Sequence, residues 1–408
     1  QKVCDVSLRF SPSDVVSDFR IRAGQNIQDE HFKLIFCALG SLLEAFWACK
    51  LTGFQPSFMS PAKSTFLVWA AFIIGGAGNN RGMLIKKEFL AGFTTFITMA
   101  YIIFVNPQIM AESGMDQGAI FVGTCVAAAI ACFVMGFYAN WPIGLAPGMG
   151  LNAFFTYTVV GEMGYSWEVA LGAVFIAGIL FFIMSITKLR RWMLDSIPLS
   201  LRIAMGCGVG LFIGFIGLKS GGIVVSNDAT FLSLGNFDNT ETLLAAIGFL
   251  LISVLAIRKI TGAIIIGVLV ITFASLFLNL VEFNGVVSYP PELSPTLMKL
   301  DIIGALDVAM ISIIMSFLFV NLFDTAGTLL GVATRANIID QNGNATNLNK
   351  ALLADSGSSI FGTFFGCSPV TSYVESSAGV EAGGRTGLTA VTVGLLFPLA
   401  IFFSPIAI

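Results

Sequence analysis

The chain has 408 residues, of which 56% are hydrophobic and only 11% are charged, and its formal net charge is −3. Ordinary soluble domains carry about 25% charged residues, so this composition excludes a soluble fold, and the weak net charge gives no indication of a basic nucleic-acid-binding surface. Apolar stretches recur near the ~20 residues that a helix needs to cross a bilayer. The sequence therefore predicts an all-α polytopic membrane protein.

Residues 1–85 differ from the rest of the chain. They are polar to about Asp29 and then contain two short apolar stretches, at 33–48 and 64–76, neither of which matches a membrane span. The first thirty residues also lack the continuous apolar core of a signal peptide. We expect an atypical amino-terminal segment, followed by a membrane domain over residues 86–408.

The membrane domain is predicted to contain about eleven spans, because apolar runs alternate with polar breaks. The predicted spans are 88–111, 117–139, 142–160, 167–187, 197–218, 242–257, 261–281, 307–332, 351–366, 368–383 and 386–407. Most lysines and arginines fall in alternate loops, which the positive-inside rule assigns to the cytoplasm. These cationic residues are Lys86, Lys87, Lys188, Arg190, Arg191, Arg258, Lys259, Arg335, Lys350 and Arg385. The chain is thus expected to be a multi-pass protein whose first span enters from the cytoplasm.

Two predicted spans begin with helix-breaking residues. The third contains two prolines and three glycines between Trp141 and Asn152, and the tenth begins with Gly366 and Pro369. Non-helical backbone at membrane depth persists only where protein or a water-filled cavity satisfies it. Paired interruptions therefore indicate an internal repeat and a substrate site near the bilayer midplane. A pair of simple proline kinks is the alternative interpretation.

Carboxylates inside the predicted spans are the strongest functional candidates, since an ionisable group there costs ~2.5–3.5 kcal/mol on insertion scales. Asp324 in the eighth span and Glu375 in the tenth meet this criterion. A low-dielectric cavity favours a neutral carboxyl group, so protonation could couple to binding of a neutral substrate. Capping of backbone amides is the alternative for both. Asp355, near the start of the ninth span, is expected to cap that helix.

Four further residues are candidate contacts for a flat, polar base. Asn152 can donate and accept hydrogen bonds, and it is equally suited to a helix N-cap. Phe154 and Tyr373 could stack on a base, although one aromatic among 38 phenylalanines is more often part of the core. Thr325 adjoins Asp324, but helix-to-helix hydrogen bonding is the commoner role of such a residue.

The sequence offers little for enzymatic chemistry. Its only histidine, His31, lies outside the predicted spans, which excludes a Ser-His dyad or a multi-histidine zinc site in the membrane. A Walker-type Gly-Lys-Ser/Thr loop is missing from the sequence, and an aspartyl intramembrane protease would need a second aspartate beside Asp324. We predict neither an enzyme nor a metal or organic cofactor, with the proton as the only coupling ion.

Four long strings link this sequence to a known family. They are Gly92–Tyr101, Ala146–Phe155, Val320–Thr328 and Ser368–Val380. From about Lys87 to Ile408, the sequence resembles the azaguanine-resistance type of hypoxanthine/adenine/guanine permeases, a branch of the nucleobase:cation symporter-2 families in the xanthine/uracil permease superfamily. The resemblance implies proton-coupled import of purine nucleobases, with adenine favoured over hypoxanthine and guanine, across the plasma or inner membrane.

The same resemblance implies a fold of two inverted seven-span repeats. A core domain, with spans at about 88–187 and 307–407, would carry the site and move against a gate domain at about 197–281. The third and tenth spans would each contain a short strand and a half-helix. The partners expected are a purine nucleobase and the lipid bilayer, without nucleic acid, and a homodimer is left open.

Particular roles also follow from matching positions in the family. Asp324 matches the proton-linked acid, Glu375 the purine-binding glutamate that would share in proton coupling, and Asn152 a polar substrate contact. Asp324, Phe154, Tyr373 and Thr325 complete the candidate substrate-binding set.

The chain also departs from the family pattern. Residues 1–85 do not resemble the family's short amino-terminal arm, and the chain stops at the eleventh span, so we expect a truncated fold without the second half of the gate. Two alternatives remain open at this stage. The first is a membrane fragment that cannot transport, and the second is an anion transporter or channel with the same architecture.

Overall fold

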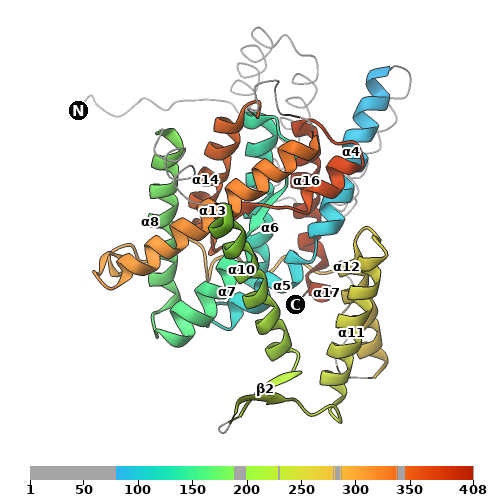
Figure 1. The fold of residues 1–408 in the computed structure, drawn as a ribbon, viewed down its shortest axis with the longest axis vertical. Coiled ribbons are helices and arrows are strands. Elements are labelled where there is room, and N and C mark those ends of the chain that lie inside the picture. The colour runs from blue at the N-terminus through green and yellow to red at the C-terminus, as the bar shows by residue number, and fades with distance from the viewer. Residues whose placement is uncertain are drawn as a thin grey trace, which may run out of the picture. The chain divides into compact units, whose positions relative to one another are not determined.

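Helices make up most of the computed structural model (Figure 1), which describes residues 80–187, 199–227, 230–278, 280, 285, 287–336, 338 and 345–407. The predicted amino-terminal segment, except for residues 80–85, lies outside the described residues. Asn80–Ile408 form one compact unit. The predominantly helical, membrane-type fold predicted from composition is confirmed.

The helices follow the predicted order along the chain. They are α4 (Asn80–Met99), α5 (Ile102–Ala111), α6 (Gln117–Val134), η1 (Met135–Ala139), α7 (Met149–Ala153), η2 (Phe154–Glu162), α8 (Trp167–Ile186), α10 (Leu199–Ser220), α11 (Thr240–Ile257), α12 (Ala263–Phe277), η3 (Gly304–Leu306), α13 (Met310–Ala336), α14 (Leu348–Phe364), α15 (Ser376–Glu381), α16 (Gly387–Ala400), η4 (Ile401–Phe403) and α17 (Ser404–Ala407). The strands are β1 (Leu145–Pro147), β2 (Val224–Asn227), β3 (Phe231–Leu234) and β4 (Val370–Ser372).

Five helices in the described residues are long and apolar enough to cross a membrane by themselves. They span Ile85–Ala111, Gln117–Ala139, Trp167–Ile186, Thr240–Ile257 and Met310–Ala336. Several other predicted spans form helices that are shorter, such as α12 and α16, or richer in serine, such as α14. The number of spans in the two inverted repeats stays a prediction.

The two interrupted segments were predicted correctly. Each contains a short strand and then a short helix, β1 before α7 and β4 before α15. The strands pair antiparallel, with Ala146 opposite Thr371. Backbone bonds extend the ladder at both ends, from Gly148 N to Pro369 O at 2.9 Å and from Tyr373 N to Gly144 O at 3.0 Å. The extended backbone thus finds its partners within the protein, as hydrocarbon requires.

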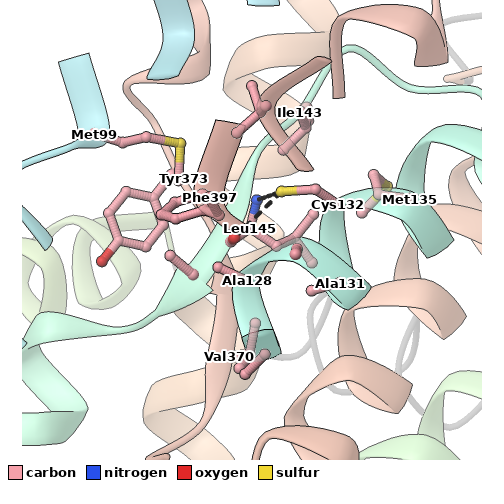
Figure 2. Packing of buried hydrophobic residues seen from close by; sticks show 14 of the residues in the cluster. Met99, Ala128, Ala131, Cys132, Met135, Ile143, Leu145, Val370, Tyr373 and Phe397 are labelled. Carbon is pink, nitrogen blue, oxygen red and sulfur yellow. Dashed lines mark hydrogen bonds between the residues drawn. The ribbon is translucent and has the colours of Figure 1, made fainter. Parts of the chain in front are cut away.

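The paired strands lie within a buried apolar cluster. In Figure 2, Leu145 of β1 and Val370 of β4 lie among side chains of α4, α6 and α16, including Met99, Cys132 and Phe397. The Cys132 thiol also contacts the Leu145 backbone, with Leu145 N 3.2 Å from the sulfur. A second cluster packs α7, η2 and α8 against the amino-terminal half of α13, around Phe155, Phe181 and Phe317.

The helices α11 and α12 lie side by side (Figure 1), and close glycine contacts join them. Gly248 of α11 faces Ile271, and Gly267 of α12 faces Ile252. Much of their remaining apolar surface is exposed, including Leu250 and Phe273. Such a surface is typical of helices that face lipid. Their assignment to a separate gate domain stays a prediction.

Candidate functional site

Glu375 lies at the junction between β4 and α15, where the interrupted tenth segment returns to helix. It occupies the residue before α15, and its side chain is half-buried. The Tyr101 hydroxyl donates a hydrogen bond to Glu375 Oε1 at 2.6 Å, and the Thr98 hydroxyl lies 3.4 Å from the Glu375 carbonyl oxygen. Glu375 is therefore anchored by the end of α4 and by the break that precedes α5.

Asp324 lies on α13 within electrostatic range of Glu375 and Asp355, and the Thr371 side chain of β4 is beside it. The Asp324 side chain is exposed on the described chain. Its carboxyl group nevertheless lies among protein atoms that keep much of the water away from it. A strand end and one face of α13 thus bring the two acids together.

Asp355 is fully buried, and the expectation that it caps a helix is wrong. The helix α14 begins at Leu348, so Asp355 lies two turns inside it. Its Oδ1 accepts a hydrogen bond from the Thr325 hydroxyl at 2.8 Å. Its Oδ2 accepts two more, from Ser372 N at 2.8 Å and the Ser372 hydroxyl at 2.5 Å. Asp355 therefore fixes β4 to α13, beside Asp324.

Asn152 is fully buried in α7, and its N-cap interpretation is wrong because Gly148 occupies the N-cap of that helix. Its side-chain amide donates to Asn106 Oδ1, and its Oδ1 accepts from the Ser368 hydroxyl. Asn106 in turn donates to the Thr124 hydroxyl at 2.6 Å. Asn152 thus joins the two interrupted segments through a buried polar network.

The two candidate aromatic residues have different surroundings. Tyr373 is buried, near Met99 and Phe397 in Figure 2, and its hydroxyl donates to Pro147 O at 2.6 Å. Tyr373 therefore also joins the two segments. Phe154 is half-buried and packs edge-on against Phe317, with ring centroids 5.0 Å apart. This contact belongs to the second apolar cluster.

The structure gathers part of the predicted set around β4. Glu375, Asp324 and Tyr373 are neighbours, and Thr325 joins them through Asp355. Among the described residues, no hydrogen bond links Asn152 to either predicted acid. A search of the same residues finds no cluster of three metal-ligating side chains. The arrangement offers acidic hydrogen-bond acceptors to a ligand that carries N–H donors.

Sequence reasoning missed one residue and misjudged another. Tyr101 had no chemical signal of its own, although it ends the family string Gly92–Tyr101. Asp355 was noticed but given a local role, because its partners Thr325 and Ser372 lie 30 and 17 residues away.

Comparisons with known proteins place the chain in a family. A family profile described as the permease family matches residues 86–408. The chain is 47% identical over 325 residues to the adenine permease AdeQ of Escherichia coli, covering 80% of this chain and 73% of that protein. It is 42% identical over 337 residues to the guanine/hypoxanthine permease PbuG of Bacillus subtilis, covering 80% and 76%.

The fold also resembles a solved transporter structure. The transmembrane domain of a cyanobacterial bicarbonate transporter, BicA, matches with a TM-score of 0.58 at 15% identity, covering 80% of this chain and 84% of that domain. At this identity the likeness concerns the fold alone. With its membrane-type helices and its permease relatives, the chain is a multi-pass integral membrane transporter and not an enzyme. It belongs to the permease family of the nucleobase:cation symporters.

Proposed function

We propose that this chain imports purine nucleobases together with protons, with adenine preferred. The observation that carries the proposal is Glu375, a half-buried carboxylate at the end of a strand inside an interrupted span. Permeases for adenine and for guanine and hypoxanthine are its relatives, and the identity to the adenine permease is the higher of the two. Purine edges carry the N–H donors that a carboxylate accepts.

Each acid has a separate role in the proposal. Glu375 accepts an N–H of the base, and the more exposed Asp324 takes up and releases the proton. The two are close enough to interact electrostatically, so loss of one negative charge by protonation changes the field at the other. The core would then rock past the gate to expose the loaded site on the other side of the membrane.

Uptake measurements test the substrate. Purine-uptake-deficient cells expressing the chain are given labelled adenine or hypoxanthine, with bicarbonate flux as a parallel assay. We expect adenine uptake above that of empty cells and a loss of at least ~10-fold in Glu375→Gln, the effect of one charge-assisted hydrogen bond. Anion flux that purines do not affect would support an anion transporter instead. A chain that inserts into the membrane and binds purines but does not take them up would be unable to complete the transport cycle.

Proton coupling is tested with Asp324→Asn. The change keeps the size of the side chain and removes its titration. We expect uptake in this variant to lose its dependence on an imposed pH gradient, while purified protein still binds adenine. Unchanged gradient dependence in a variant present at normal levels in the membrane would exclude Asp324 as the proton-coupling acid.

A further inference from the structure

The first span is interrupted next to the candidate site. α4 ends at Met99 and α5 begins at Ile102, and the backbone between them tightens, with Ile103 N bonded to Ala100 O at 3.1 Å. Tyr101 lies in this break and is half-buried. Its side chain crosses to the tenth segment, and its hydroxyl reaches Glu375 Oε1 at 2.6 Å.

The two oxygens of the Glu375 carboxylate are unequal. Oε1 accepts the Tyr101 hydroxyl, whereas no hydrogen bond to Oε2 is found within the described ranges. Asp355, in contrast, uses both oxygens for protein donors. Glu375 is therefore held on one side only, with a second oxygen available to a ligand.

Packing around this contact holds the backbone of Glu375 against α4. Thr98, one turn before Tyr101, lies 3.4 Å from the Glu375 carbonyl oxygen, so the end of α4 contacts the backbone of the glutamate and the break after it contacts the side chain. Further along α15, Gly379 packs directly on the backbone of Ala91 in α4. The helix that carries Glu375 and the helix end that carries Tyr101 thus form one unit.

We propose that Tyr101 is a positioning residue for substrate binding: it holds Oε1 of Glu375 and so presents Oε2 to an N–H of the base. This inference rests on the proposed purine transport and adds a residue to the proposed binding site. A carboxylate that is already oriented loses less rotational freedom when the base binds, which raises affinity without a new contact to the base. Tyr101 therefore acts on substrate affinity and leaves the rate of transport by loaded protein nearly unchanged.

Tyr101→Phe tests the inference, since it removes one oxygen atom and keeps the ring. Tyr157→Phe is the matched control, because Tyr157 also donates to a glutamate, Glu112 Oε1, at 3.0 Å, but in an exposed pair. We expect Tyr101→Phe to raise the KM for labelled adenine ~10-fold at nearly constant maximal rate, the worth of one hydrogen bond to a charged group. Tyr157→Phe should leave both values as in the parent protein.

A second measurement separates positioning from a general structural role. Adenine binding to purified protein is compared in the parent, Tyr101→Phe, Glu375→Gln and the double variant. A neutral amide accepts a weaker hydrogen bond than a carboxylate, so Tyr101→Phe should weaken binding ~10-fold in the parent and under ~3-fold in the Glu375→Gln background. Equal losses in both backgrounds, or an unchanged KM, would overturn the positioning role while purine transport stands. A parent protein that neither binds nor transports purines would overturn the proposed function, and the positioning role with it.

Discussion

At the scale of single residues, Asp355 and Glu375, two carboxylates near β4, differ in how many hydrogen bonds they accept from the protein. Asp355 accepts three hydrogen bonds from Thr325 and Ser372 in a fully buried position. Such a group stabilises the fold and has little capacity left for a ligand. In the part of the chain that the structure describes, the Glu375 carboxylate accepts one hydrogen bond, at Oε1 from Tyr101, which leaves Oε2 for a ligand, as expected of a binding group.

Replacement of Asp355 by asparagine should destabilise the protein. The amide has one acceptor oxygen, so its NH2 group would face a donor from Thr325 or from Ser372, and leaving a buried donor without an acceptor costs about 1–3 kcal/mol. We expect a lower apparent melting temperature of the purified protein in detergent. Asp116→Asn is the control: Asp116 caps α6 by accepting from Ala119 N at 2.7 Å, and asparagine caps as well as aspartate. Equal melting temperatures for the two variants would contradict the structural role of Asp355.

At the scale of elements, a single glycine allows α15 to approach α4. A Cβ atom on Gly379 would lie 2.5 Å from the carbonyl oxygen of Ala91 and would also collide with the Thr95 hydroxyl. Because backbone atoms cannot move aside as a flexible side chain can, any larger residue must push the two helices apart. The Tyr101–Glu375 contact depends on that close approach.

Gly379→Ala should therefore reduce adenine uptake by at least as much as Tyr101→Phe does. The added methyl group moves the whole of α15, and Glu375 with it. Gly327→Ala is the matched control, because Gly327 lies in α13 with open space around its Cα atom, and alanine is tolerated there. Uptake by the Gly379 variant at the level of the Gly327 variant would show that the close approach does not matter for transport.

Local chemistry explains which elements could be predicted from sequence. The two interrupted spans were predictable because proline and glycine act on the backbone next to them, and Asp324 and Glu375 because charge in an apolar run is conspicuous. The partners of Asn152 and Tyr101 were not predictable in this way. Ser368 lies 216 residues from Asn152, and Glu375 lies 274 residues from Tyr101, so only the folded chain brings them together. Phe154 is one of 38 phenylalanines, and its sequence context did not distinguish it from the others.

At the scale of the whole molecule, the distribution of lysine and arginine predicts the orientation in the membrane. Lys350, just inside α14, should face the cytoplasm, and Asp238, before α11, should face the opposite side. Both side chains are exposed in the structure. Cysteines introduced singly at these two positions can be compared with the parent protein, which accounts for labelling of native thiols.

A membrane-impermeant thiol reagent should label Asp238→Cys in intact cells and Lys350→Cys only after the cells are opened. The reverse pattern would mean that the chain inserts in the opposite orientation. Labelling of both positions in intact cells would contradict the assignment of these loops to opposite sides of the membrane.

The pairing of β1 with β4 has a consequence for how the protein is made. The Tyr373 hydroxyl and its acceptor, Pro147 O, are 226 residues apart in sequence, and β1 is synthesised long before its partner strand. In the interval, hydrocarbon offers no partner for the backbone of β1, at a cost of several kcal/mol for each unsatisfied group. The nascent chain must therefore keep this segment in the insertion machinery or in contact with water until the ribosome delivers β4. The candidate site therefore cannot assemble until β4 has been synthesised.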